Sequence, residues 1–398
     1  MALSAISMTD YSSFFRHAIM RSLKHVLASV QETKTHVLAE EREQALYTLT
    51  YTLKMRNAWP HSLELLLIIA PNMEQEGYRD GWMVYLQSAI EQSLRLKDPQ
   101  GEAKLRFHLG VLHKYLAEFQ KAAREFDSSA AYFERVGEPH LQARALSHLG
   151  DVVRFQRDFH KATQLVHTAL ELVPQENAQQ AHSYLVLGTI ALDLRQWEDA
   201  GEWFEQSLAL SEEMNDQRLI AWSLNNLGII LKELKKYQEA IACYKRASQL
   251  YERIQDPFHQ ALARINLGNV YFALERWQEA LELYLLVKRT FRETPAGLHL
   301  ARVNNNIGMA YQKLQQWDNA KRAFLSSIEQ WEQIGRTNSL VNTLDNLGLL
   351  YLEQERIDEA INTFQDALKW LAQMKNDPTY HYYSDMVTRH LEEAIKLK

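Results

Sequence analysis

A chain of 398 residues with 46% hydrophobic and 24% charged positions has the composition of a globular protein, not of a disordered or fibrous one. Its 44 basic and 50 acidic residues give a formal net charge of −6, which offers no electrostatic argument for nucleic-acid binding. The single cysteine, Cys243, excludes an internal disulfide framework and a cysteine-based metal site. No apolar stretch reaches the roughly 18 residues that cross a bilayer, and MALSAISMTD lacks the basic residues of a secretory signal. We therefore expect a cytoplasmic protein that has no membrane segment.

The first 100 residues read as helices without a clear repeat. Residues 10–57 fit two helices, and residues 61–98 fit two more in the register of a degenerate repeat. The apolar stripe of the first helix consists of Phe14, Ile19, Leu23, Val26 and Leu27. We expect residues 1–100 to form an N-terminal helical segment.

A repeat of about 40 residues organises residues 101–376. A Leu-Gly or Ile-Gly pair recurs seven times, at intervals of 40, 38, 40, 40, 40 and 40 residues. The repeat glycines are Gly110, Gly150, Gly188, Gly228, Gly268, Gly308 and Gly348. Alanine follows each of them twelve residues later, and large apolar residues follow nine and sixteen residues later.

Each repeat is predicted to fold as a pair of helices. Apolar residues at three- and four-residue spacing indicate two amphipathic helices per repeat. The glycine allows the first helix to approach its neighbour closely, because it has no side chain. Pairs such as Asp256-Pro257 are expected to end the second helix, since proline disfavours helix in the residue before it. No single pair can bury its apolar face, so the repeats must stack.

The last residues, 377–398, follow Asp377-Pro378 and read as a polar helix. Such a helix provides the polar outer face that the end of a repeat stack requires. The expected organisation is therefore an N-terminal segment over 1–100, seven repeats over 101–376 and a C-terminal cap over 377–398.

The repeat resembles the tetratricopeptide repeat family. The resemblance rests on the Leu-Gly pair, a tyrosine three residues later in three repeats, and an alanine followed four residues later by Phe or Tyr. It covers roughly two-thirds of the chain and departs in length, with 40 residues against about 34 in the family. Repeats of this length resemble those of bacterial peptide-responsive regulators, kinesin light chains and large signalling ATPases. The resemblance implies an all-α, right-handed α-solenoid with a concave groove.

One stripe of the first helices is expected to face that groove. At about 100° per residue, the positions six before, two before, one after and five after the glycine lie away from the packed side. Two before the glycine, four successive repeats carry asparagine. The predicted peptide-binding residues on and near this stripe are Asn226, Asn266, Asn269, Asn306, Asn346, Trp222 and Arg302.

Two interpretations of the asparagine ladder stay open. An amide donates and accepts hydrogen bonds, so a ladder of amides suits the backbone of an extended peptide. Asparagine also has poor helix propensity, so its repeated mid-helix placement asks for a reason. Alternatively, each asparagine bonds to the neighbouring helix or to a carbonyl of the preceding turn, or the four record repeat duplication alone. Trp222 is either a ligand anchor or a side chain packed against the next repeat.

Basic residues gather at the other end of the same stripe. This basic groove patch consists of Lys104, Lys114, Arg144, Arg154, His108 and His148. Such a patch suits an acidic segment or a C-terminal carboxylate, while the alternative is an ordinary solvated helix face.

We find no sequence feature of an enzyme. The chain has no Gly-rich phosphate loop, HExxH or GxSxG motif, and its histidines are not spaced as metal ligands on one helical face. Cys243 reads as a small buried or half-buried residue. We expect no catalytic residue, metal or cofactor.

The sequence favours a non-enzymatic scaffold or adaptor that binds an extended peptide or a partner's tail in the groove. The alternative is a peptide-sensing bacterial regulator whose N-terminal helices act on a signalling partner. A third interpretation is the sensor part of a larger signalling assembly. A nucleic-acid or membrane partner is not expected, and exposed aromatics such as Phe14 and Phe15 would permit a homo-oligomer.

Overall fold

The computed structural model describes residues 8–33, 39–75, 79–173, 178–292, 297–375, 377 and 379–398, and every regular element in these ranges is a helix. Residues 1–7 lie outside the described ranges, and they include most of the segment considered as a secretory signal. The predicted boundary residues Asn376 and Pro378 also lie outside these ranges. The contacts divide the chain into two compact units, unit 1 (Met1–Ser223) and unit 2 (Leu224–Lys398). The boundary lies inside a helix, α11 (Gln217–Glu233).

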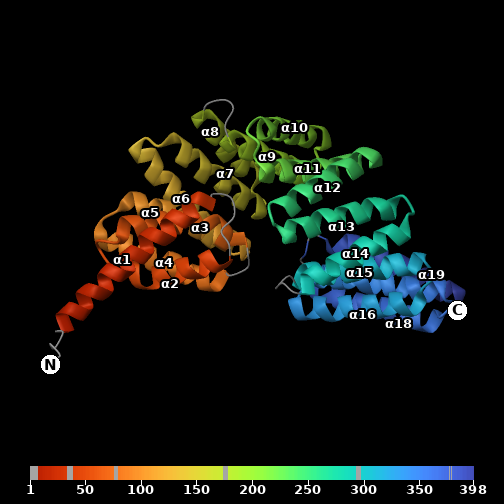
Figure 1. Ribbon diagram of the computed structural model, residues 1–398. Coiled ribbons are helices and arrows are strands. Elements are labelled where there is room, and N and C mark those ends of the chain that lie inside the picture. Colours follow the sequence, from red (N-terminus) through yellow and green to blue (C-terminus); the bar gives the residue numbers. More distant parts are fainter. Residues whose placement is uncertain are drawn as a thin grey trace, which may run out of the picture. The chain divides into compact units, whose positions relative to one another are not determined.

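The helices of each unit follow one another along the chain (Figure 1). Unit 1 contains α1 (Met8–Thr33), α2 (Ala39–Thr52), α3 (Trp59–Gln75), α4 (Arg79–Leu96), α5 (Pro99–Tyr115), α6 (Phe119–Val136), α7 (Pro139–Phe155), α8 (Phe159–Leu172), α9 (Ala178–Asp193), α10 (Trp197–Glu213) and the first part of α11. Unit 2 contains the rest of α11, α12 (Tyr237–Arg253), α13 (Pro257–Ala273), α14 (Trp277–Arg292), α15 (Gly297–Lys313), α16 (Trp317–Ile334), α17 (Thr337–Glu353), α18 (Ile357–Leu371), the short 3₁₀ helix η1 (Ala372–Met374) and α19 (Tyr380–Leu397).

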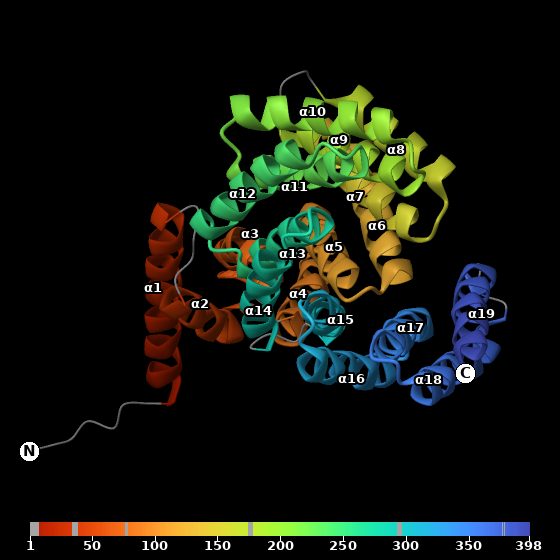
Figure 2. The same ribbon diagram turned by 90° about the vertical axis from the view of Figure 1, so that its right-hand side faces the viewer.

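Helices α5 to α18 form the predicted repeats as consecutive helix pairs. Within unit 2, α15 packs on α16, α16 on α17 and α17 on α18, and α19 packs against α17 and α18 (Figure 2). Within unit 1, α5 to α8 pack in the same sequential way. The prediction of an all-α solenoid of helix-turn-helix repeats is therefore confirmed within each unit, while the three-part division into 1–100, 101–376 and 377–398 stays a prediction.

The repeat glycine packs against the second helix of its own repeat. A Cβ atom on Gly348 would overlap Cε1 of Phe364, well inside van der Waals contact. The same relationship joins each repeat glycine to the large apolar residue sixteen positions later. The close approach predicted from the glycine is thus confirmed, and its partner is the side chain that follows the repeat alanine by four residues.

The turn inside each repeat has a left-handed residue that is not glycine. Seven residues after the repeat glycine, φ lies between 57° and 65° in all seven repeats. These residues are Ala117, Arg157, Arg195, Lys235, Glu275, Gln315 and Glu355. For a residue with a Cβ, this conformation costs roughly 1–2 kcal/mol, so the helix pairs must determine the turn.

The Asp-Pro pairs begin helices as well as separating them. Helix α12 already ends at Arg253, and Pro257 is the first residue of α13. The carboxylate of Asp256 accepts a hydrogen bond from the backbone N–H of His259 at 3.0 Å. Aspartate at the N-cap and proline in the first turn both favour a helix start, so the pair sets where the next repeat begins.

Buried apolar side chains form a separate core in each stretch of repeats. In unit 1 one cluster joins α1 to α5 and another joins α5 to α10, and in unit 2 two clusters extend from α12 to α19. Within the described residues, none of the helices combines the length and apolar character needed to cross a membrane.

Candidate functional site

The asparagine ladder lies on the first helices of four successive repeats. Asn226 is on α11, Asn266 on α13, Asn306 on α15 and Asn346 on α17, all in unit 2. All four side chains are half-buried. They are neither sealed in the core nor fully exposed.

Three of these amides donate to the first helix of the preceding repeat. The Nδ2 of Asn266 lies 3.2 Å from Oδ1 of Asn225, and the Nδ2 of Asn306 lies 3.1 Å from Oδ1 of Asn269. In the third bond of this kind, the Nδ2 of Asn346 donates to Oδ1 of Asn305 at 3.0 Å. Each bond joins two stacked repeats, as one of the two interpretations of the ladder requires.

The same bonds leave the other side of each amide available. In the part of the chain that the structure describes, no hydrogen bond uses Oδ1 of Asn266, Asn306 or Asn346. An amide carries two donors and one acceptor, so a second N–H also remains. The interhelical bond therefore orients the amide without consuming its capacity to bind a ligand.

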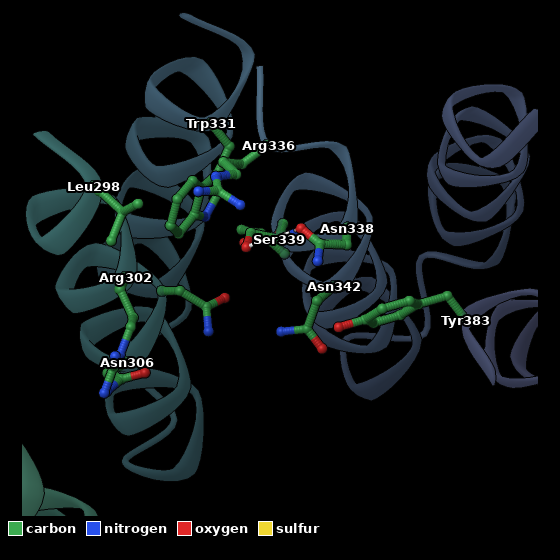
Figure 3. Close-up of a pocket in the computed structure, with 11 residues that line it drawn as sticks. Leu298, Arg302, Asn306, Trp331, Arg336, Asn338, Ser339, Asn342 and Tyr383 are labelled. Carbon is green, nitrogen blue, oxygen red and sulfur yellow. Dashed lines mark hydrogen bonds between the residues drawn. The ribbon is translucent and has the colours of Figure 1, made fainter. Parts of the chain in front are cut away.

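A cavity of about 520 Å³ opens beside the ladder in unit 2. Four helices and the loop before α17 contribute to it: Arg302 and Asn306 extend from α15, Trp331 from α16, Asn342 from α17, and the ring of Tyr383 from α19 (Figure 3). Its lining consists of Leu298, Arg302, Asn305, Asn306, Trp331, Arg336, Asn338, Ser339, Asn342, Thr343 and Tyr383.

The lining of this cavity is cationic and rich in amides. It contains two guanidinium groups, those of Arg302 and Arg336, and no carboxylate. Loss of water around Arg302 lowers the pKa of its guanidinium, an effect that Tyr284 opposes, but arginine stays charged in proteins. Two cations, four amides and three hydroxyl groups suit an anionic ligand with a peptide backbone.

The structure brings only part of the predicted peptide-binding set together at this cavity. Arg302 and Asn306 line it, whereas Asn226, Asn266, Asn269 and Asn346 are not among its lining residues. Asn269 accepts hydrogen bonds from both Asn306 and the Tyr284 hydroxyl, the latter at 2.7 Å. Trp222 is half-buried on the part of α11 that belongs to unit 1.

The predicted basic groove patch separates into two groups in unit 1. Lys104, His108 and Arg144 line a second, smaller cavity. In the other group, Nζ of Lys114 lies 3.0 Å from Oδ2 of Asp151, and Arg154 binds both Asp151 and Asp193. Acidic side chains of neighbouring repeats therefore neutralise the second group.

His148 belongs to neither group. Its ring stacks on His182 with 4.4 Å between ring centroids, and it meets Phe107 edge-on at 5.0 Å. Burial holds the pKa of His148 well below its usual value, and His182, Lys114, Arg144 and His108 lower it further. The imidazole is thus kept neutral and cannot contribute a positive charge to the patch.

Several cavity residues were not part of the predicted site. Trp331, Arg336, Asn338, Ser339 and Tyr383 line the unit 2 cavity without having been identified as binding residues from the sequence. A signal existed for the tryptophan, since an aromatic residue stands 23 positions after the repeat glycine in several repeats: Phe133, Tyr251, Phe291 and Trp331. The other four lie at the start of α17, in the loop before it, or on α19, where the repeat pattern gives no guidance.

The described residues contain no cluster of three or more His, Cys, Asp or Glu side chains arranged to hold a metal ion. Cys243 is half-buried, and burial raises the pKa of its thiol. Cys243 therefore keeps its proton and packs as a small side chain, as predicted.

Comparison with known families matches the repeat region. The model of the tetratricopeptide repeat matches residues 179–253, 219–293 and 299–371. These matches cover the helix pairs from α9 to α18, which include both the ladder and the unit 2 cavity.

Similar solved structures have the same fold at low sequence identity. A Rap protein complexed with Competence and Sporulation Factor gives a TM-score of 0.52 at 14% identity, over 84% of this chain and 99% of the Rap chain. Aspartyl phosphate phosphatase F from Bacillus subtilis gives 0.54 at 15%, over 93% and 96%. A signal transduction ATPase with a tetratricopeptide repeat sensor, from Pyrococcus horikoshii, gives 0.60 at 12%, over 98% and 67%. These likenesses show the fold alone.

Proposed function

Since this chain is built from tetratricopeptide repeats, we propose that it is a non-enzymatic scaffold that binds an extended peptide or partner tail along unit 2. The single observation that carries the proposal is the cationic, amide-rich cavity that contains Arg302 and Asn306 and has no carboxylate in its lining. The unbonded amide oxygens of the ladder continue the binding surface along three repeats. Together they offer charge recognition at one point and backbone recognition beside it.

The preferred ligand has an acidic side chain or a C-terminal carboxylate at the cavity. The guanidinium groups of Arg302 and Arg336 can each form a charge-assisted pair with a carboxylate, and Asn342 and Tyr383 add neutral donors. The ladder oxygens accept from backbone N–H groups, which every peptide carries, so they bind with little dependence on sequence. In unit 1, Lys104 and Arg144 provide a second place where acidic groups are attracted.

The comparisons support a ligand-binding role only by analogy. One structural neighbour was solved with Competence and Sporulation Factor, and another carries its repeats as a sensor. A third neighbour is named a phosphatase. Since the sequence has none of the catalytic motifs that we sought, we extend ligand binding and not catalysis to this chain.

The test is a titration of the full chain with a library of short peptides, half with a free C-terminal carboxylate and half amidated, followed by fluorescence anisotropy. We expect acidic or carboxylate-terminated peptides to bind, and the double variant Arg302→Gln/Arg336→Gln to weaken them at least about tenfold. Asn306→Ala should weaken binding less. Arg253→Gln and Asn362→Ala change exposed residues on second helices and serve as matched controls. If no peptide binds saturably, or if the cavity variants bind like the unaltered chain, the proposal is wrong.

A second function is favoured by an aromatic surface on the N-terminal helices. Phe14 on α1 is 76% exposed and Tyr47 on α2 is 63% exposed. Phe15 and Tyr47 each pack edge-on against Tyr51, with ring centroids 5.7 and 5.2 Å apart. A cluster of exposed aromatic side chains on a protein surface indicates a contact site. We propose that this surface contacts a signalling partner or a second copy of the chain, as in the regulator interpretation.

This second function is tested by placing a photo-crosslinking residue at position 14 of the full chain in the producing cells. Reproducible cross-links to one protein, or to the chain itself, that disappear with Tyr47→Ser would support it. Cross-links that survive this substitution would show that the aromatic surface does not determine the contact.

A further inference from the structure

Unit 1 contains a cavity at the same place in the repeat as the cavity of unit 2. Its volume is about 240 Å³. It is lined by Leu67, Pro71, Lys104, Phe107, His108, Phe133, Leu141 and Arg144. The first helices of two consecutive repeats contribute to each cavity, α5 and α7 in unit 1 and α15 and α17 in unit 2. Helices α3 and α6 also line the unit 1 cavity, and α16 and α19 also line the unit 2 cavity.

Six lining positions of the two cavities correspond in the repeat, and the remaining lining residues have no counterpart in the other cavity. Six residues before the glycine stand Lys104 and Arg302, and 23 residues after it stand Phe133 and Trp331. The residues at these positions differ in chemistry. Three residues before the glycine, Phe107 in unit 1 stands where unit 2 has Asn305. Six residues before the next glycine, Arg144 stands where unit 2 has Asn342. The fold therefore places part of both linings at the same repeat positions, and the sequence gives each cavity a different chemistry.

The floor of the unit 1 cavity is apolar. Phe107 is 5% exposed and Phe133 is 2% exposed, and Leu67 and Leu141 complete the walls. The guanidinium carbon of Arg144 lies 4.3 Å from the centroid of the Phe107 ring, so the cation covers one face of this aromatic floor. Ligand pockets for drug-sized molecules measure roughly 300–1,000 Å³, so this smaller cavity suits one compact apolar group.

The rim of the cavity carries an excess of positive charge. Among the described residues, neither Lys104 nor Arg144 forms an ion pair within 4.0 Å. Among the side chains that the structure describes, the carboxylate that acts on Arg144 is that of Glu74. It is bound to Nδ1 of His108 at 2.7 Å and attracts Arg144 only from a greater distance. In the described part of the rim, the carboxylate of Glu74 therefore already has a partner, and neither cation is paired with it.

We propose that the unit 1 cavity binds a compact aromatic or branched aliphatic group that carries an adjacent carboxylate. The apolar group lies against Phe107 and Phe133, and the carboxylate pairs with Lys104 and Arg144 at the rim. This inference deepens the proposal that these two cations attract acidic groups. It does not depend on peptide binding in unit 2. Two kinds of molecule carry such an apolar group next to a carboxylate, namely a free carboxylic acid and the C-terminal residue of a peptide.

The experiment titrates the full chain with three probes, phenylacetate, N-acetylphenylalanine and N-acetylphenylalanine amide, by calorimetry and saturation-transfer NMR. We expect saturable binding of at least one acid and at least about tenfold weaker binding of the amide. Tighter binding of phenylacetate identifies a free acid as the source, and tighter binding of N-acetylphenylalanine identifies a peptide terminus. Absence of saturable binding by both acids, or equal binding of the acid and its amide, overturns the proposal.

Variants locate the signal in the cavity. Lys104→Gln/Arg144→Gln should weaken the acid at least about tenfold, and Leu141→Trp, which fills the cavity and keeps both charges, should abolish binding. Arg124→Gln, an exposed cation of α6, is the matched control. Arg302→Gln should leave acid binding unchanged while it weakens the peptides of unit 2, so the two proposals can fail separately. Unaltered affinity in both unit 1 variants, with unaltered circular dichroism, would show that the probe binds elsewhere.

Discussion

The ammonium group of Lys114 on α5 lies 3.0 Å from the carboxylate of Asp151 on α7, and Asp151 also binds Arg154 at 3.0 Å. Lys114 and Asp151 are 18% and 16% exposed. This network joins two consecutive repeats of unit 1 on the face predicted to bind a ligand. It shows that a cation on the stripe can serve the stacking of repeats instead of recognition.

We predict that Asp151→Asn destabilises the protein by about 3–5 kcal/mol, because it leaves Lys114 and Arg154 partly buried without a shared counter-charge. The free energy of unfolding in urea at pH 7 measures this loss. Asp127→Asn, an exposed aspartate on α6, should change the free energy by less than about 0.5 kcal/mol. Equal effects of the two substitutions would contradict a structural role for the network.

The same aspartate predicts an acid dependence of stability. Burial alone would raise the pKa of Asp151, but Lys114 and Arg154 outweigh it and hold the pKa at about 2, against an ordinary value of 3.8. A carboxylate with a depressed folded-state pKa stabilises the protein above the unfolded pKa and loses this contribution as the pH falls. The free energy of unfolding should therefore decrease as the pH falls from about 4 to about 2. In Asp151→Asn the part of this decrease that comes from Asp151 should be absent, and urea unfolding measured across this pH range checks it.

The stacked histidines predict a second loss of stability at higher pH. Burial lowers the pKa of His182 from 6.5 to about 4, with Lys114 and Arg144 adding to the shift and Asp151 opposing it. His182 therefore binds a proton more readily in the unfolded chain than in the folded one. The neutral, buried imidazole contributes fully to stability above pH 6.5, and this contribution is lost as the pH falls towards 4. The urea midpoint should fall between about pH 6.5 and pH 4, and His182→Gln should flatten this fall. His381→Gln, an exposed control on α19, should leave the slope unchanged.

The helix pairs could be predicted because small residues and large apolar residues recur at fixed positions of the repeat. Gly348 and its aromatic neighbour Phe364 are both visible in the sequence as repeat positions, but the pattern does not state that they touch. In the structure a Cβ at Gly348 would overlap the Phe364 ring. The sequence therefore identified the elements, and the structure identified which two positions determine the distance between them.

This contact gives a direct prediction for Gly348→Ala. The added methyl group should destabilise the protein by about 1–3 kcal/mol, since the ring and the two helices must shift to admit it. Phe364→Leu in the Gly348→Ala background should recover part of this loss, because the smaller side chain makes room. A double-mutant cycle of urea unfolding measures the coupling, and strict additivity would show that the two positions do not interact.

The binding site could be predicted less well than the fold. The ladder positions follow from the 40-residue rhythm, and Arg302 and Asn306 do line a cavity. Whether a cation is available, however, depends on which acidic residue of the next repeat faces it, as Lys114 and Asp151 show. Arg336 and Tyr383 lie outside the helical positions that the repeat specifies, so periodicity carries no information about them.

The left-handed turns provide the last prediction, because their strain was not evident from the sequence. Ala117 has a φ of 57° in the turn between α5 and α6, a conformation that costs a residue with a Cβ roughly 1–2 kcal/mol. Ala117→Gly should relieve this cost and lose about 0.4–1 kcal/mol through the greater freedom of glycine in the unfolded chain. We expect a net gain of about 0.5–1 kcal/mol in the free energy of unfolding. The matched control, Ala131→Gly at an exposed position inside α6, should instead lose about 1 kcal/mol, and a loss of equal size at Ala117 would show that its turn is not strained.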